Sequence, residues 1–268
     1  MKWSTSALPA LCLLFLCTVV SAEEFTLSLT APNMPPAFTA EYAVKVGGMS
    51  MGKLDVNLTQ IDPENWTYHS SSTALGLAAM FVGGDPVTDT AKLKLIDNEV
   101  RPTFYERIRK TKKADKSERV FYQWDKELAQ SEYRDRKLEV NLNAHTTDKF
   151  TLQLLIMANI KSIPEKMVLP VISKAKLRDY QIINYGAVTL NTIYGERNTI
   201  LIERIKGDSS YRIWADPAAH GLPLQIERIK EGKSEYMVKI QDSSLHKESK
   251  KITTQTMSHP QPSSLQPK

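Results

Sequence analysis

The sequence predicts a mainly β protein, with a large antiparallel sheet or half-open β-barrel wrapped around one central apolar helix. Short runs in which apolar and polar residues alternate recur along most of the chain, and turn-forming residues separate them. Only one stretch, near residue 150, carries apolar residues at helical spacing instead. With 41% hydrophobic and 24% charged residues among 268, the composition excludes collagen-like, coiled-coil and wholly disordered chains.

The N-terminus has the pattern of a secretory signal peptide. Lys2 supplies a positive charge, residues 8–20 form an apolar run, and small residues precede a cleavage point after Ala22. The run is shorter than the roughly 20 apolar residues that span a bilayer. We therefore expect a cleaved signal peptide over residues 1–22, a periplasmic protein, and no transmembrane segment after cleavage. The chain's two cysteines both lie in this peptide, so the mature chain is expected to hold no disulfide.

The rest of the chain divides into a leader, one domain and a tail. Residues 23–37 form a Pro-rich leader, because proline lacks the N–H group that a regular strand requires. Residues 38–241 carry the alternating runs without an internal repeat, and we expect them to form a single β-rich domain. Residues 242–268 are polar with few apolar residues, which predicts a disordered tail.

The alternation in the first half of the domain begins at Phe38. A turn at Gly47-Gly48 connects two alternating runs, which predicts a hairpin over residues 38–58. A small-residue, apolar segment at 74–82 predicts a short buried helix or a wide loop. Further strands are predicted at residues 66–72, 92–96, 103–109 and 119–124, and around Val140.

The single helix is predicted to follow Thr147-Asp148, whose side-chain oxygens can cap its first turn. Its apolar positions leave few polar interruptions, so the helix must be buried on nearly all sides. Two interpretations follow. The helix lines a ligand cavity or covers it as a lid, or it fills the protein core. The residues that would contact a ligand are Phe150, Leu154, Leu155 and Met157.

Strands resume after Pro164 and Pro170, which end the helical region. Alternating runs predict strands at residues 177–185, 188–194, 199–205 and 211–214. The last two strands, at 222–229 and 236–240, are expected to form a hairpin across Glu231-Gly232.

No motif in the sequence names a reaction. The five histidines lack metal-ligand spacing, and phosphate-binding glycine patterns are missing, so we expect no metal and no cofactor. Ser210, Asp216 and His220 are close in sequence and could in principle form a triad, but an Asp-Pro turn followed by a His-Gly loop explains them more simply. The net charge of +5 is too small for a nucleic-acid-binding protein.

The sharpest charge feature is a basic segment between two predicted strands. One interpretation is a hairpin that contacts an anionic partner, such as phospholipid head groups or an acidic envelope polymer. The alternative is a solvated hairpin tip whose charges discourage pairing with other strand edges. The candidate anion-contacting residues are Arg107, Arg109, Lys110, Lys112 and Lys113, followed by Lys116 and Arg119.

A set of short motifs occurs in order along the domain: Phe38-Thr39-Ala40-Glu41-Tyr42, Gly52, Arg101-Pro102 before Phe104, Asp148, Tyr194-Gly195, Trp214 and Leu222-Pro223. Together these motifs resemble the bacterial exported family known as domain of unknown function 3108 (DUF3108). The resemblance spans residues 38–240 and implies an envelope location and an architecture similar to the periplasmic lipoprotein carriers, a half-open barrel with a helical lid. It implies no catalytic residues.

From these observations we expect a periplasmic, non-enzymatic protein that binds a hydrophobic or amphipathic envelope component, such as a lipid, an acyl chain or a lipoprotein-like ligand. The first alternative is a structural or assembly partner of another envelope protein or polymer, without a ligand cavity. The second is a hydrolase of envelope polymers, because catalytic groups can be assembled from residues far apart in the sequence.

Overall fold

The computed structural model describes residues 27–76, 86–111 and 114–246. The predicted signal peptide, most of the segment at 74–82, Lys112 and Lys113, and the tail beyond residue 246 lie outside the described residues. The strands of the first half are β1 (Phe38–Val46), β2 (Met49–Asp62), β3 (Asn65–Ala74), β4 (Val87–Ile96), β5 (Glu99–Ile108), β6 (Lys110–Thr111), β7 (Ala114–Asp115), β8 (Glu118–Gln123), β9 (Leu128–Tyr133) and β10 (Arg136–Asn141).

The second half contains one described α-helix and the remaining strands. These are β11 (Thr147–Asp148), α2 (Thr151–Ala158), β12 (Lys166–Ile172), β13 (Leu177–Thr192), β14 (Gly195–Lys206), β15 (Ser209–Asp216), β16 (Leu222–Lys230) and β17 (Lys233–Ser243). Single 3-10 turns form η1 (Ala31–Asn33), η2 (Trp124–Lys126) and η3 (Pro217–Ala219).

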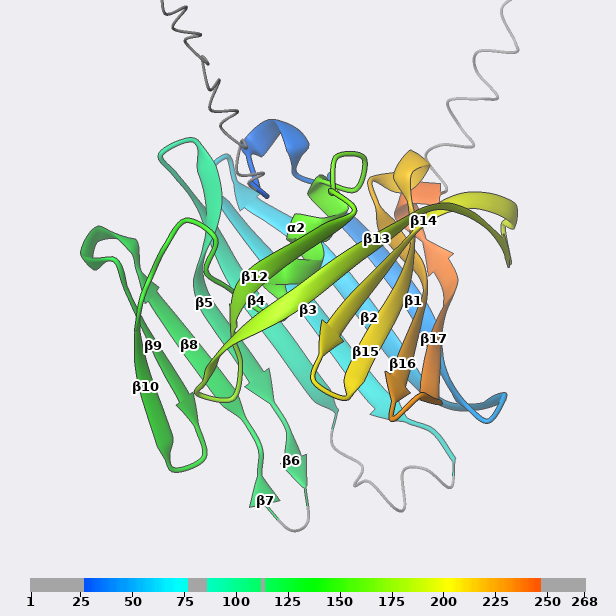
Figure 1. The fold of residues 1–268 in the computed structure, drawn as a ribbon, viewed down its shortest axis with the longest axis horizontal. Coiled ribbons are helices and arrows are strands. Elements are labelled where there is room, and N and C mark those ends of the chain that lie inside the picture. The colour runs from blue at the N-terminus through cyan, green and yellow to red at the C-terminus, as the bar shows by residue number, and fades with distance from the viewer. Residues whose placement is uncertain (1–26, 77–85, 112–113, 247–268) are drawn as a thin grey trace, which may run out of the picture.

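In the described part of the chain, all strands except the small β6–β7 pair belong to one sheet of 15 strands. Its order is β10-β9-β8-β5-β4-β3-β2-β1-β17-β16-β15-β14-β13-β12-β11, and only the β11–β12 pair is parallel. The sheet does not close, because β10 and β11 form its two ends without pairing to each other. The sheet curls until β12 and β13 pass in front of strands from the first half (Figure 1). The predicted mainly β fold is therefore confirmed.

The alternation in β1 shows why these segments form strands. Phe38, Ala40 and Tyr42 are buried, whereas Thr39 and Glu41 between them are exposed, so one face of the strand packs on the core. The predicted hairpin between β1 and β2 is present, with Phe38 paired to Leu58.

Two of the longer strands, β9 and β12, were not predicted from the sequence, and neither were the two-residue strands β6, β7 and β11. In β9, the buried positions include the small residues Ala129 and Ser131, so the strand lacks a strong apolar pattern. In β12, Pro170 suggested the end of a segment. The proline is tolerated because β11 pairs only with the two residues after it, Val171 and Ile172, which leaves its own position on that side unpaired.

The two strands predicted at 177–185 and 188–194 are one strand, β13. Gly186 has φ of +80°, and the pairing with β14 shifts register between Asn184 and Ala187. This is a β-bulge, in which the strand bends but continues. Gly186 therefore marks a bend within one continuous strand, whereas the prediction ended one strand before it and began another after it.

The N-cap residue of helix α2 is Phe150, and Asp148, one of the two predicted capping residues, accepts hydrogen bonds from the first turn. Oδ1 of Asp148 accepts hydrogen bonds from the backbone N–H groups of Phe150 and Thr151, both at 2.8 Å, and Oδ2 accepts one from the Thr151 hydroxyl at 2.7 Å. Burial raises the pKa of Asp148, although these hydrogen bonds oppose that shift. The cap is thus a fully buried carboxyl group that joins the end of β11 to the helix.

The helix packs between two apolar clusters. Leu154 and Met157 belong to the cluster formed mainly by β1–β5 and β8–β10, whereas Leu152 and Ile156 belong to the cluster formed by β12–β15. This explains why its sequence has almost no polar face. The helix has eight residues and lies toward one end of the curled sheet, so the structure does not show the predicted central helix (Figure 1).

The packed region extends beyond the predicted domain limits of 38 and 241. Leu27 and Leu29 are buried although they lie in the predicted leader, and the Leu29 carbonyl accepts a hydrogen bond from the Val100 N–H group. At the other end, Leu245 and His246 are buried although they lie in the predicted disordered tail. Composition alone missed these contacts because a few apolar residues suffice to anchor a short segment to an existing core.

Gly221 provides a stability prediction, because it lies directly beside α2. Its φ is +71°, and a Cβ atom there would lie 2.6 Å from the Met157 carbonyl oxygen. We expect Gly221→Ala to lower the free energy of unfolding by about 1–2 kcal/mol for the left-handed backbone and by about 1–3 kcal/mol more for overpacking. Gly207 has φ of +58° but open space around it. In urea unfolding, Gly207→Ala should therefore lose only the first part, and equal losses would contradict a tight contact with the helix.

Candidate functional site

The concave face of the sheet contains an apolar cavity of about 700 Å³. Its wall comes from strands on both sides of the β1–β17 pair, which are neighbours in the sheet although they lie at opposite ends of the domain sequence. The inward positions of β1, β2, β15 and β17 line it with Tyr42, Val44, Leu54, Val56, Ile213 and Val238.

Helix α2 and its N-cap residue form one boundary of this apolar cavity, but mostly through residues that were not predicted. Of the four predicted residues, only Phe150 lines the cavity. Leu154 and Met157 are fully buried in the core, so the core-filling interpretation holds for them. Leu155 borders a separate small crevice instead.

The cavity-lining residues that the sequence analysis missed on α2 are Gln153 and Ile156. Those on the strands could have been found, because the alternation of β1 and β2 already marks their inward positions.

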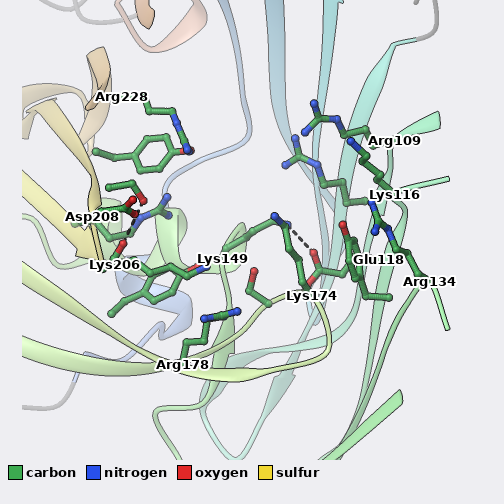
Figure 2. Close-up of a pocket in the computed structure, with 18 residues that line it drawn as sticks. Arg109, Lys116, Glu118, Arg134, Lys149, Lys174, Arg178, Lys206, Asp208 and Arg228 are labelled. Atoms are coloured by element: carbon green, nitrogen blue, oxygen red, sulfur yellow. Dashed lines mark hydrogen bonds and ion pairs between the residues drawn. The ribbon is translucent and has the colours of Figure 1, made fainter. Parts of the chain in front are cut away.

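A second cavity, of about 720 Å³, adjoins the first and is strongly basic. Among the described residues, two acidic side chains line it, Glu118 and Asp208. Side chains from both sides converge on the space between them (Figure 2). The ten cationic residues that line it are Arg107, Arg109, Lys116, Arg134, Lys149, Lys174, Arg178, Arg204, Lys206 and Arg228.

Glu118 connects the two sides of the basic cavity. It lies at the start of β8 and is 2% exposed. One carboxylate oxygen accepts a hydrogen bond from Lys149 Nζ at 2.7 Å, and the other accepts one from the backbone N–H group of Lys174 in the β12–β13 turn. This carboxylate is therefore a direct link between β8 and the β12–β13 turn, and Figure 2 shows its ion pair with Lys149.

Tyrosine rings hold the arginines of the β14–β16 side in place. The Arg204 guanidinium lies 4.4 Å from the ring centre of Tyr211 and 5.2 Å from that of Tyr180. Arg228 donates a hydrogen bond to the Tyr211 hydroxyl. Burial raises the pKa of Tyr211, but the Tyr236 hydroxyl and the two arginines outweigh it and lower the pKa below its usual value. The positive charges of Arg204 and Arg228 thus favour the ionised form of the Tyr211 hydroxyl.

Several cations of this cavity have no carboxylate within ion-pair distance in the part of the chain that the structure describes. Partial burial, followed by the charges of neighbouring cations, lowers the pKa of both Lys174 and Lys206. The buried Nε atom of Arg178 finds no hydrogen-bond acceptor among the described residues. Burying a polar group without a partner destabilises a fold, so an acceptor that pairs with the Arg178 Nε–H group would be stabilising.

The predicted basic hairpin supplies part of this cavity. Its tip forms the β6–β7 pair, as a hairpin requires. Arg107 and Arg109 line both cavities, and Arg107 pairs with Asp89 at 3.2 Å. Lys110 lines the apolar cavity only. Two arginines at the base of the segment therefore contribute to both cavities, although Arg109 is also exposed to solvent.

The possible Ser-His-Asp triad is not assembled. The Ser210 hydroxyl donates to Glu203 at 2.7 Å. Asp216 pairs with His246 at 3.1 Å and not with His220. The pKa of Asp216 is lowered because this bond and others outweigh its burial.

Among the described residues, no three His, Cys, Asp or Glu side chains are grouped to hold a metal ion. The described helices also include none that is long and apolar enough to cross a bilayer.

One large, unclosed and mainly antiparallel sheet with two adjoining cavities places the chain in the class of mainly β, barrel-like proteins. The family model of DUF3108, a protein of unknown function, matches residues 41–239, so the chain belongs to this family, as its motifs indicated.

No curated protein matches the chain. Among solved structures it is similar to a β-barrel-like protein of domain of unknown function DUF1849 from Brucella abortus. The TM-score is 0.47 and the sequence identity 5%, over 81% of this chain and 98% of that chain.

Proposed function

We propose that the protein is an exported, non-enzymatic binding protein for an amphipathic, anionic component of the cell envelope. The hydrocarbon part occupies the apolar cavity and the charged part faces the basic cavity. In this proposal the curled sheet acts as a half-open barrel, with α2 at one end of the ligand space. The signal-peptide pattern of residues 1–22 supports export to the periplasm.

The observation that carries the proposal is the continuity of the two cavities. Five residues line both of them: Arg107, Arg109, Lys149, Arg204 and Tyr211. Valine, leucine and isoleucine side chains lie on one side of this boundary, and unpaired cations lie on the other. An amphiphile has the same division, an apolar chain next to a charged group.

The sizes and energies fit a ligand with both parts. Each cavity falls within the roughly 300–1,000 Å³ typical of small-molecule sites. A chain of about ten methylenes gains at most ~8 kcal/mol on leaving water, and association itself costs ~4–15 kcal/mol. Hydrocarbon burial alone therefore gives weak binding, and ion pairs with the head group would supply the remainder.

The apolar half is tested with Val44→Glu. Val44 lines the cavity and is only partly buried, so a carboxylate there reaches water and the sheet stays folded. The charge nevertheless makes binding of a hydrocarbon chain in the cavity unfavourable. We expect the variant to bind a neutral fluorescent naphthylamine dye at least tenfold more weakly than the unaltered protein. The matched control is Val168→Glu, because Val168 is 56% exposed and lies outside both cavities.

The control should bind the dye as the unaltered protein does, and both variants should keep their β-sheet circular dichroism spectrum. Equal dye binding by all three proteins, or no binding by any of them, would overturn the assignment of the apolar cavity to hydrocarbon.

A further inference from the structure

The basic cavity lies between the two ends of the open sheet. One wall comes from β5, β8 and β9, which lie near the β10 end of the sheet order, and the other comes from β13 to β16, which lie toward the β11 end. In the described residues no strand hydrogen bonds join these walls. In Figure 2, Arg109, Lys116 and Arg134 face Lys206 and Arg228 across the cavity.

The positive charge of these walls is mostly uncompensated. Of the ten cations, Arg107, Lys149 and Arg228 have a carboxylate partner. For the other seven, no carboxylate lies within ion-pair distance among the described residues. These seven occur on both walls: Arg109, Lys116 and Arg134 on one, and Lys174, Arg178, Arg204 and Lys206 on the other.

One phosphate group carries about −1.5 to −2 charges at neutral pH, so a single phosphate offsets only a fraction of seven cations. The cavity volume of about 720 Å³ is also that of a site for a whole small molecule. Arginine favours phosphate because its planar guanidinium can donate two parallel hydrogen bonds to it. Charge, volume and side-chain chemistry all indicate an anion with more than one phosphate.

We infer that the head group of the ligand carries two or more phosphates and bridges the two ends of the open sheet, with cations of both walls bound to it. This inference rests on the proposed function for the location of the hydrocarbon chain. The polyanion takes the place of carboxylate partners for the seven cations. It thereby attracts both walls, whose positive charges otherwise repel each other.

The test uses inorganic tripolyphosphate and orthophosphate as probes in titration calorimetry, because neither has a hydrocarbon chain. Each wall is weakened separately, by Arg109→Gln with Lys116→Gln and by Arg178→Gln with Lys206→Gln. We expect tripolyphosphate to bind more tightly than orthophosphate. Each double variant should lower its affinity at least tenfold and reduce the dependence of affinity on salt.

The charge-matched control is Lys94→Gln with Lys233→Gln, since both lysines are exposed and lie outside the two cavities. It should leave the affinity for tripolyphosphate unchanged. Tripolyphosphate binding that is no tighter than orthophosphate binding, or that is lost from only one wall variant, would overturn the bridging role. An equal loss of tripolyphosphate affinity in the control variant would also overturn the bridging role. Thermal unfolding without ligand checks that every variant is folded.

The neutral dye separates this inference from the proposed function. Dye binding by the unaltered protein, together with no tripolyphosphate binding, would overturn only the polyphosphate inference. Tripolyphosphate binding without dye binding would overturn only the hydrocarbon site. Dodecyl diphosphate should bind more tightly than tripolyphosphate, and binding that is no tighter would assign the cavity to a soluble polyanion and overturn the amphiphile.

Discussion

Replacing Leu154 with Asp is expected to unfold the protein. The side chain is 0% exposed, packs in the larger apolar cluster and contacts neither cavity. A carboxylate there would be a buried charge without a partner, which costs several kcal/mol even when the group takes up a proton. Because small domains have only about 5–15 kcal/mol of stability, we expect Leu154→Asp to lose its cooperative thermal transition in circular dichroism.

Leu154→Ala removes the packing without adding a charge, so it serves as the graded control. It should remain folded and lose about 2.7–5 kcal/mol of unfolding free energy in urea. A Leu154→Asp protein with a native unfolding temperature would contradict the core position of this residue. It would instead support the lid that the helical pattern first suggested.

The sequence predicted the strands well where one face of a strand is buried and the other face is exposed to solvent. β1 is the clearest case, because Phe38, Ala40 and Tyr42 alternate with exposed residues. The pattern fails where a strand's inward residues are small, as Ala129 and Ser131 are in β9. A period-two pattern reports the burial of large apolar groups, and small residues in the same positions give no such signal.

The helix shows a different limit of sequence reasoning. A buried apolar stripe predicts that a helix packs against something, but it does not distinguish a protein core from a ligand cavity. Leu154 faces the core while Phe150, at the start of the same helix, lines the cavity. That difference depends on how the sheet curls around α2, which only the tertiary structure shows.

The basic cavity could be predicted only in part. Arg107, Arg109 and Lys116 were identified because they lie within a dense basic segment. Arg178, Arg204 and Lys206 are scattered over β13 and β14, where alternating charged residues are ordinary for the solvent face of a sheet. They reach the same cavity because the open sheet curls until its two ends face each other, a long-range property that no local pattern records.

Glu118 links the two ends of the sheet directly. Its buried carboxylate binds Lys149 Nζ and the Lys174 N–H group at once, so its removal leaves a largely buried ammonium and a backbone donor without their acceptor. Breaking a buried ion pair from one side costs about 3–5 kcal/mol. We therefore expect Glu118→Ala to lose about 3 kcal/mol of unfolding free energy in urea, the lower limit because Lys149 keeps some contact with water.

The control for this prediction is Glu132→Ala, which breaks the exposed ion pair with Lys137 and should cost about 0–1 kcal/mol. Glu118→Ala also removes an acid from a cavity already rich in unpaired cations, so its affinity for tripolyphosphate should rise. A ligand that binds only the folded protein stabilises it more the tighter it binds, and saturating tripolyphosphate should therefore restore more stability to Glu118→Ala than to the unaltered protein. Equal stabilisation of both proteins would mean that the anion does not occupy the space beside Glu118, whereas a Glu118→Ala protein as stable as Glu132→Ala would mean that this carboxylate does not hold the two ends together.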